Sequence, residues 1–384
     1  MIKLTKNSNK NNKEKNMSIN NNEIIKNLNN NNIKNYFDFK TEGEIYSITL
    51  SNDDNILIIG DGCDNTYFYN IASKHLIKKL SINKESVSFL SFSHDNNYLI
   101  SASLDGIIHI FSPSKNYVLL NKINTHSEEI IWVEWSPIGP MFALGNKDGS
   151  IFVYLANNPI NPITFYNHYE CTTQGKFTND GFNLISIGED GILNIYDLKN
   201  KKLIKNIKSE IGPLLCMCLS VNNNNKLIAV GSLFKEIQFI SYEKQKIVFY
   251  KQFEIERKKC SNDSSNFECG IETICFCFDN NYCVFSDSEC NLNVFDINNM
   301  EIRSKIEFDN ENATKITVSN IKNYLIYVSG SNGNIYLIDT RSNAKIIKKI
   351  KLHNDVIMDF VLSKKEEFLI SSSLDKTINY LDLK

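Results

Sequence analysis

The sequence predicts an all-β fold, a closed eight-bladed β-propeller with four antiparallel strands in each blade. Two observations lead to this prediction: a short apolar run that ends in small residues occurs eight times, and most copies precede a tight Asp-Gly or Asn-Gly turn. The turn residues Asp64, Asp105, Asp148 and Asp190 follow one another at intervals of 41 to 43 residues, the length of a four-stranded propeller blade. Residues 36–384 are therefore expected to form a single propeller domain.

The eight apolar runs predict one buried strand in each blade. They occupy residues 56–60, 98–103, 141–145, 183–188, 226–232, 282–286, 324–329 and 368–373. The turns after most of them supply the positive φ angles that two-residue hairpins need, so a further strand is expected at residues 107–111, 151–155, 193–197, 335–339 and 378–382. The fifth and sixth copies are the weakest, because residues 234–236 and 288–290 lack an Asp-Gly turn.

The first 35 residues differ in composition from the rest of the chain. They contain seven Lys, two acidic residues and 14 Asn without apolar periodicity, which predicts a disordered Asn/Lys-rich tail at residues 1–35. Codon bias explains this composition more simply than a functional arm does, although both explanations stay open. Residues 254–270 are also polar and predict a mobile insertion in a loop between two blades.

The last copy ends after its third strand, so we expect another part of the chain to supply its fourth. Residues 36–39 (Tyr-Phe-Asp-Phe) have a strand-like pattern of side chains. This N-terminal segment is expected to pair with residues 378–383 and to close the ring.

Short phrases at the strand ends resemble the WD-repeat family, and the resemblance covers residues 36–384. The phrases are residues 91–95 (Ser-Phe-Ser-His-Asp), 135–137 (Trp-Ser-Pro), 195–198 (Ile-Tyr-Asp-Leu) and 337–341 (Leu-Ile-Asp-Thr-Arg). The family's turn aspartate has a structural role, which the resemblance assigns to Asp105, Asp148, Asp190 and Asp375. Its Gly-His position keeps a histidine only as His126 and His353, so the family's hydrogen-bonded set is most nearly complete through His353, Ser373 and Asp375.

The chain carries no recognisable enzyme signature, and we expect neither catalytic residues nor a cofactor. A phosphate-binding glycine loop, a Gly-x-Ser-x-Gly elbow and a His-Glu-x-x-His motif are all missing. The Cys216/Cys218 and Cys275/Cys277 pairs each share one face of a predicted inner strand, which favours a buried apolar role over metal binding. The start of the sequence lacks an apolar signal segment, and no stretch of about 20 apolar residues occurs. We therefore expect reduced thiols and a cytoplasmic location, with the nucleus as a second compartment.

Acidic residues recur in the loops that enter the first strand of each blade. In a propeller these loops lie on one face, together with the turns between the second and third strands; we call it the top face. The residues predicted to bind a partner there are Glu85, Glu128, Glu129, Trp132, Glu170, Glu210, Asp309, Glu311 and Asp355. A ring of carboxylates favours a basic protein segment, although the general polarity of loops explains part of the pattern. Trp132 is either an exposed anchor or a packing residue.

Within the WD-repeat family, the phrase at residues 131–137 and the degenerate fifth turn are similar to a branch that acts in ribosome assembly. This resemblance implies a monomeric, non-enzymatic protein whose acidic top face chaperones the basic N-terminal segment of a late-joining large-subunit ribosomal protein. The formal net charge of −2 argues against direct nucleic-acid binding, and no membrane contact is expected. The alternatives are a scaffold or adaptor in signalling or ubiquitin-ligase complexes, and a propeller that docks a catalytic subunit.

Overall fold

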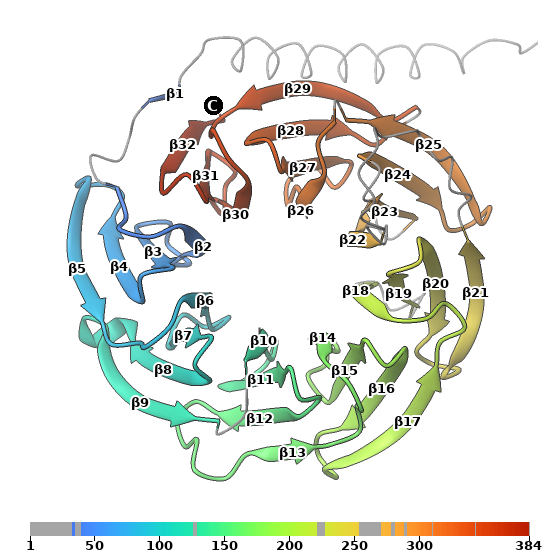
Figure 1. Ribbon diagram of the computed structural model, residues 1–384, viewed down its shortest axis with the longest axis horizontal. Helices are drawn as coiled ribbons and strands as arrows, with labels where there is room; N and C mark the ends of the chain where they lie inside the picture. The colour runs from blue at the N-terminus through green and yellow to red at the C-terminus, as the bar shows by residue number, and fades with distance from the viewer. Residues whose placement is uncertain are drawn as a thin grey trace, which may run out of the picture.

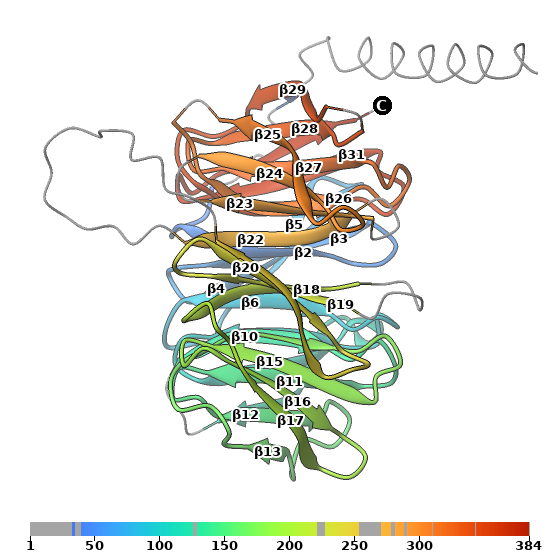
Figure 2. The same ribbon diagram turned by 90° about the vertical axis from the view of Figure 1, so that its right-hand side faces the viewer.

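The strands form a closed ring of eight sheets, as predicted (Figure 1). The computed structural model describes residues 33–34, 40–125, 129–220, 227–252, 270–277, 281–287, 290–308, 310–341 and 343–383. Seen edge-on, the ring presents its connecting loops on two opposite faces (Figure 2). No helix in these ranges has the length and apolar character required to cross a bilayer.

Each sheet contains four strands, ordered from the centre of the ring to its periphery, and we number the blades 1 to 8 by their innermost strands. The innermost strands are β2 (Ile45–Leu50), β6 (Val87–Phe92), β10 (Ile130–Trp135), β14 (Thr172–Phe177), β18 (Leu214–Leu219), β22 (Ile271–Cys277), β26 (Ala313–Val318) and β30 (Ile357–Leu362). The second strands are β3 (Ile56–Asp61), β7 (Leu99–Ser103), β11 (Met141–Asn146), β15 (Asn183–Gly188), β19 (Leu227–Ser232), β23 (Tyr282–Asp287), β27 (Leu325–Gly330) and β31 (Phe368–Ser373). All eight predicted apolar runs fall on these second strands.

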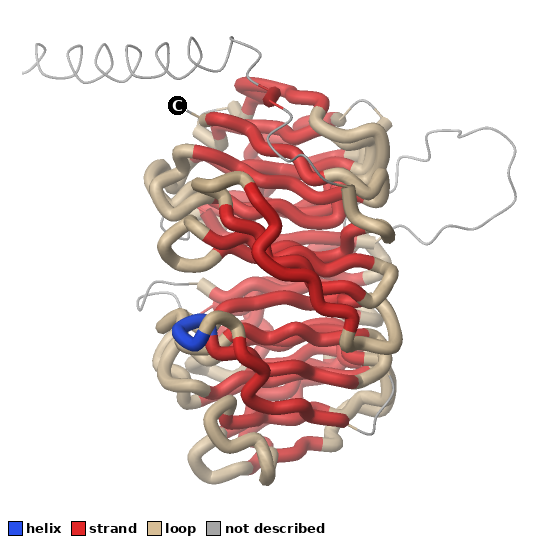
Figure 3. The backbone as a smooth tube through the Cα atoms, turned by 90° about the vertical axis from the view of Figure 1, so that its left-hand side faces the viewer, coloured by secondary structure: helices blue, strands red, loops and turns tan. Residues whose placement is uncertain are grey.

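The outer half of each sheet completes the blade. The third strands are β4 (Asn65–Asn70), β8 (Ile107–Ser112), β12 (Ile151–Leu155), β16 (Ile192–Asp197), β20 (Glu236–Ser241), β24 (Asn291–Asp296), β28 (Asn334–Asp339) and β32 (Ile378–Asp382). The outermost strands are β5 (His75–Ser81), β9 (Val118–Asn124), β13 (Ile163–Phe165), β17 (Lys202–Lys208), β21 (Lys246–Gln252), β25 (Glu301–Glu307), β29 (Lys345–Lys351) and β1 (Ile33–Lys34). A short 3-10 helix, η1 (Pro113–Lys115), joins β8 to β9 and is the blue segment in Figure 3.

The turn between the second and third strands has the same backbone feature in all eight blades: one residue has a positive φ. The residues at this position are Asp64, Gly106, Gly149, Gly191, Lys235, Cys290, Gly333 and Lys376. Blades 5 and 6 keep this positive φ despite their weak sequence motifs, with φ of 60° at Lys235 and 65° at Cys290, although residues 288–289 of the blade 6 turn lie outside the described residues. Asp64, from which the first predicted interval was counted, occupies the position that is glycine in blades 2, 3, 4 and 7.

An N-terminal strand completes blade 8, as expected, but it is not the predicted segment. β1 pairs antiparallel with β32, so that Ile33 lies opposite Leu381 and Lys34 opposite Tyr380. The strand lies inside residues 1–35, which were predicted to be a tail, whereas residues 36–39 lie outside the described residues. The pairing needs only backbone groups, which the free edge of β32 offers to any extended segment, so side-chain alternation was a poor guide to the register.

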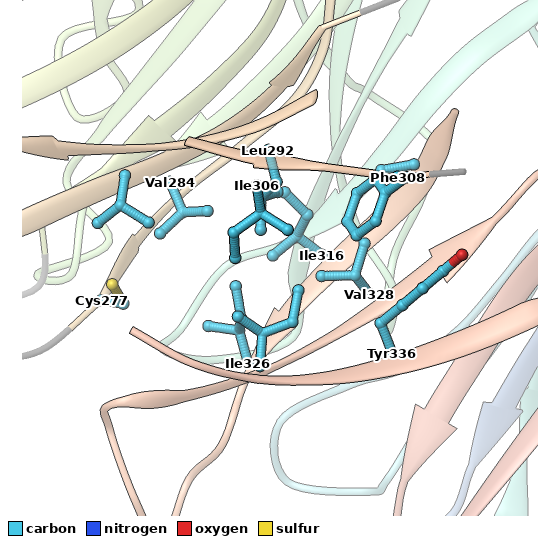
Figure 4. Packing of buried hydrophobic residues seen from close by; sticks show 12 residues of the cluster. Cys277, Val284, Leu292, Ile306, Phe308, Ile316, Ile326, Val328 and Tyr336 are labelled. Atoms are coloured by element: carbon cyan, nitrogen blue, oxygen red, sulfur yellow. The ribbon is translucent and has the colours of Figure 1, made fainter. Parts of the chain in front are cut away.

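Apolar side chains fill the spaces between neighbouring blades. Between blades 6 and 7, Val284 and Leu292 belong to one cluster with Ile326 and Val328, and all four are 0% exposed (Figure 4). Alternate residues of a strand point to opposite sides of its sheet, so each blade contributes one row to each of two interfaces. Burial of one such side chain contributes about 1.5–3 kcal/mol.

Polar contacts add to the interface between blades 8 and 1. The backbone N–H of Ile48 donates to the Asp359 carboxylate at 3.0 Å, and the N–H of Lys364 donates to Asp54 at 2.9 Å. The ring is therefore closed by a fourth strand and by direct contacts between its first and last blades.

Candidate functional site

The top face is held together by the same backbone hydrogen bond in seven blades. In each, an amide of the turn between the second and third strands donates to a carbonyl in the loop that enters the innermost strand, as from Gly62 to Glu44 at 2.8 Å and from Leu233 to Pro213 at 3.0 Å. The other pairs are Leu104 to Ser86, Lys147 to Glu129, Glu189 to Cys171, Ser331 to Asn312 and Leu374 to Val356. Side chains of the loops and turns are thereby placed on a fixed frame.

The four predicted turn aspartates are built into this frame. A carboxylate oxygen of each accepts the backbone N–H of the residue two positions later. The pairs are Asp105 with Ile107 at 3.0 Å, Asp148 with Ser150 at 2.9 Å, Asp190 with Ile192 at 3.0 Å and Asp375 with Thr377 at 3.0 Å. Asp105, Asp190 and Asp375 also accept an amide from the entering loop, so these carboxylates serve the turn geometry.

Within the described residues, the histidine network is present in blade 4 as well as in blade 8, where the sequence predicted the most nearly complete set. In blade 8, His353 reaches Asp375 at 3.3 Å and Ser371 at 2.8 Å; Ser371 therefore takes the place predicted for Ser373, whose hydroxyl accepts the Asp375 amide instead. In blade 4, His168 contacts Asp190 at 3.0 Å and Ser186 at 2.7 Å.

The prediction that the histidine remains only at His126 and His353 was thus wrong, because His168 makes the same contacts. A signal for it was present in the sequence, since His168 and His353 each precede their aspartate by 22 residues. No glycine precedes His168, so a search for the Gly-His pair misses it. His126 lies outside the described residues.

The histidine networks affect the ionisation of the turn aspartates. Burial disfavours the charged carboxylate, but the hydrogen bond from His168 and those from backbone amides outweigh it and lower the pKa of Asp190. At Asp375, hydrogen bonds from His353 and Thr377 likewise outweigh burial and hold the pKa well below its usual range. Both carboxylates are therefore anchored in their charged form.

Glu311 was predicted to bind a partner, and this prediction was wrong because its side chain is buried. It is 1% exposed, and its carboxylate accepts hydrogen bonds from the Asn332 N–H at 2.9 Å, the Asn334 side chain at 2.7 Å and the Tyr336 hydroxyl at 2.5 Å. The turn of blade 7 contains Asn332-Gly333 and has no aspartate, so the entering loop supplies the carboxylate. A partner cannot reach this group.

Trp132 is a packing residue, not an exposed anchor. Its side chain is 5% exposed and lies between blades 3 and 4, where a Cβ placed on Gly175 would come within 2.0 Å of the indole ring. The absence of a side chain at Gly175 therefore makes room for the indole. The sequence alone does not distinguish the two roles, because both place a tryptophan near the end of an inner strand.

The remaining predicted acids differ in their availability to a partner. Glu85, Glu170, Glu210 and Asp355 are exposed, whereas Glu129 forms an ion pair with Lys147 at 2.7 Å. Glu128 and Asp309 lie outside the described residues. The carboxylates that the structure leaves open are therefore fewer than the predicted ring and are unevenly distributed around it.

Within the part of the chain that the structure describes, a group of open carboxylates lies over blades 4 and 5, together with aromatic side chains that the sequence did not predict. We call it the acidic-aromatic sector and define it as Tyr169, Glu170, Glu189, Glu210 and Phe234. Tyr169 is 83% exposed, Phe234 is 47% exposed, and the three glutamates are exposed. Among the described residues, none of these glutamates has a Lys or Arg partner within ion-pair distance.

Hydrogen bonds and close packing hold this sector in place. The Tyr169 amide donates to Asp190 at 3.0 Å, and the Ser209 amide donates to the Gly191 carbonyl at 2.8 Å. Phe234 covers Gly212, where a Cβ would lie 2.5 Å from the aromatic ring. The exposed groups are therefore presented by connected loops.

The cysteines of the inner strands show no metal arrangement. Cys216 and Cys277 are buried, and Cys218 and Cys275 are partly buried. Burial raises the pKa of Cys277 to about 12, which disfavours the thiolate that a metal requires. Across the described ranges, no three His, Cys, Asp or Glu side chains are placed to hold a metal ion.

A comparison with known families agrees with the geometry. A family model described as WD domain, G-beta repeat matches residues 74–112, from the outermost strand of blade 1 to the third strand of blade 2. The chain is a β-propeller of the WD40 type.

This WD40 propeller also resembles individual proteins over most of its length. It is 21% identical to human angio-associated migratory cell protein over 337 residues, which cover 86% of this chain and 76% of the relative. Its fold is similar to that of Saccharomyces cerevisiae Sqt1, with a TM-score of 0.78 at 19% identity, covering 92% of this chain and 99% of Sqt1. Chaetomium thermophilum Sqt1 bound to the N-terminus of ribosomal protein L10 gives the same TM-score and identity, with 90% and 98% coverage.

Proposed function

We propose that this protein is a ribosome-assembly factor whose top face binds the basic N-terminal segment of a large-subunit ribosomal protein. The observation that carries the proposal is the acidic-aromatic sector, where three open carboxylates and two exposed rings stand on one connected frame. Support comes from the fold, because a similar propeller has been seen with the N-terminus of ribosomal protein L10.

The carboxylates of the sector suit a basic peptide. Glu170, Glu189 and Glu210 are exposed, so each can pair with a Lys or Arg side chain without first breaking an internal ion pair with a described residue. Exposed charges of one sign attract an oppositely charged segment over about 8–10 Å at physiological ionic strength. Binding should therefore weaken as salt is added.

The aromatic rings add contacts that do not depend on salt. Tyr169 and Phe234 can stack on an Arg guanidinium or cover an apolar residue of the peptide, contributing about 0.5–2 kcal/mol per contact. We expect the peptide to keep part of its affinity at high salt, unlike a purely electrostatic ligand.

The proposal can be tested with the full-length protein and a synthetic peptide of the L10 N-terminus, titrated by calorimetry at low and high salt. The variant Glu170→Lys with Glu210→Lys should bind at least tenfold more weakly, because two attractive charges become repulsive. The matched control is Glu243→Lys with Glu301→Lys, which makes the same charge change at exposed sites on the opposite face. This control should change the affinity less than twofold.

A scrambled peptide of identical composition separates recognition from attraction by charge. The proposal requires the scrambled peptide to bind at least tenfold more weakly than the natural order. Equal affinity for both peptides, or an equal loss in the two charge-reversal variants, would contradict the proposal.

A further inference from the structure

The outer edge of blade 3 differs from those of the other seven blades. Its outermost strand, β13, has three residues, and its pairing with β12 stops where Val153 lies opposite Ile163. The next residue toward the loop, Pro162, has no N–H to donate, so the pairing is not continued to Tyr154 and Leu155. Figure 1 shows β13 at the periphery of this blade, outside β12.

This edge also lacks charge. Residues 149–169, which include β12, β13 and the loop between them, contain no Asp, Glu, Lys or Arg, although 22% of the chain is charged. Each of the seven other outermost strands carries at least one Lys or Arg. Charged side chains on an edge strand prevent unwanted pairing with another chain, and blade 3 is without this protection.

Apolar side chains are exposed along the same edge. Ile160 is 78% exposed, Tyr166 69% and Leu155 48%, and Thr164 of β13 is also exposed. A further exposed apolar residue of blade 3 is Ile138, which is 49% exposed and packs against Gly181 of blade 4. An uncharged backbone edge thus adjoins an uncharged apolar surface.

We propose that the outer edge of blade 3 is a second protein-binding site, which takes an extended, uncharged, apolar segment of a partner as a fifth strand. As the last strand of its sheet, β13 directs half of its backbone N–H and C=O groups outward, and these can pair with an incoming strand. Alternate side chains of that strand would lie on the apolar surface formed by Leu155 and Ile160.

The absence of charge selects an uncharged occupant for this edge. A charged segment would lose hydration on an edge that offers no counter-charge. The chain's own residues 1–35 contain seven Lys and are therefore a poor match. A second copy that pairs through β13 is the alternative occupant, and the sedimentation measurement below detects it.

The test uses the full-length protein and two blocked ten-residue peptides, one of alternating Val and Thr and one with Lys in place of each Thr. Affinity is measured by fluorescence anisotropy, and hydrogen exchange at residues 151–165 by mass spectrometry. The Val/Thr peptide should slow exchange of the β13 amides at least fivefold, and the Lys peptide should bind at least tenfold more weakly.

Substitutions on the edge locate the site. Ile160→Lys with Thr164→Lys should weaken binding of the Val/Thr peptide at least tenfold, whereas Ile204→Lys on β17, at a position 37% exposed, should leave it unchanged. Both residues of the double variant are exposed, and an unchanged melting temperature will establish that it folds. Binding of the L10 peptide to the top face should be the same in all variants, so failure here leaves the proposed function intact.

Three results would overturn the proposal. The first is equal affinity for the two peptides, and the second is protection at another edge strand. The third is a dimer, detected by sedimentation, that Ile160→Lys with Thr164→Lys dissociates, because the edge would then be an interface between two copies.

Discussion

In blades 4, 7 and 8 a carboxylate joins the entering loop to the turn, but the blades differ in which of the two segments supplies it. In blades 4 and 8 the turn supplies a carboxylate, Asp190 or Asp375, and the loop supplies a histidine and a backbone amide. In blade 7 the loop supplies the carboxylate of Glu311, and the turn and third strand supply the donors. The fold thus requires a buried acceptor matched to donors at this junction, and the residue type that provides the acceptor can change.

The largest effect is expected at blade 7. Glu311→Ala should lower the free energy of unfolding by about 3–4 kcal/mol, because Asn334 and Tyr336 lose a buried charged acceptor, whereas Glu311→Gln should cost about half as much. Urea denaturation measures both values. Glu129→Ala, which removes a partly exposed acid of the same face and its ion pair with Lys147, should cost less than 1 kcal/mol. An equal cost for the two alanine variants would contradict the predicted difference between buried and partly exposed acids.

The histidine networks should be next in size. His168→Ala and His353→Ala should each cost about 2 kcal/mol, because Ser186 or Ser371 and an aspartate lose a buried partner. The double variant should show the sum, since the two blades share no partners. His75→Ala, at an exposed position, serves as the control in the same urea series. An equal loss of stability in this control would contradict a stabilising role for the networks of His168 and His353.

The response to acid should distinguish the two kinds of junction. The pKa of Asp190 and of Asp375 is lowered in the folded protein, so their contribution to stability is present above about pH 4, the pKa in the unfolded chain, and is lost as the pH falls below it. The destabilisation caused by Asp190→Asn should therefore shrink by about 1 kcal/mol between pH 6 and pH 3. Unfolding curves across this range measure the change, and a pH-independent difference would contradict the assigned ionisation.

The smallest effect is expected at a carboxylate near the centre of the ring. Glu134 pairs with Lys176 of the next blade at 2.9 Å, and both side chains are about one-third exposed. Glu134→Gln should cost about 0.5 kcal/mol, less than any change at Glu311, and the urea series that includes both variants measures the ratio. A cost above 2 kcal/mol would show that the burial of a carboxylate does not determine how strongly its replacement lowers the free energy of unfolding.

The repeat fold could be predicted because its signals are local. The apolar runs and the positive-φ turns recur at a fixed period, and even Lys235 and Cys290 keep the turn geometry without an Asp-Gly motif. The position of β1 could not be predicted from a local pattern, because Ile33 pairs with a backbone edge that any extended segment could use.

The site could be predicted only in part, because burial depends on which blade covers a residue. The sequence identified Glu85, Glu170, Glu210 and Asp355 as open acids of the top face, and these are exposed. The sequence could not distinguish these exposed acids from Glu311, which lies in an equivalent loop but is buried. The aromatic half of the acidic-aromatic sector was not predicted, because Phe234 lies in a turn that lacks the Asp-Gly motif.

The strand that completes blade 8 also determines when the ring can close during synthesis of the chain. Ile33 and Leu381 are 348 residues apart, whereas within the other described sheets paired strands follow one another in the chain. At about 5–20 residues per second of synthesis, roughly 20–70 s separate the appearance of the two halves of this pair. Blades 4 and 5 can form during that interval, so the acidic-aromatic sector can exist on a nascent chain before the ring has closed.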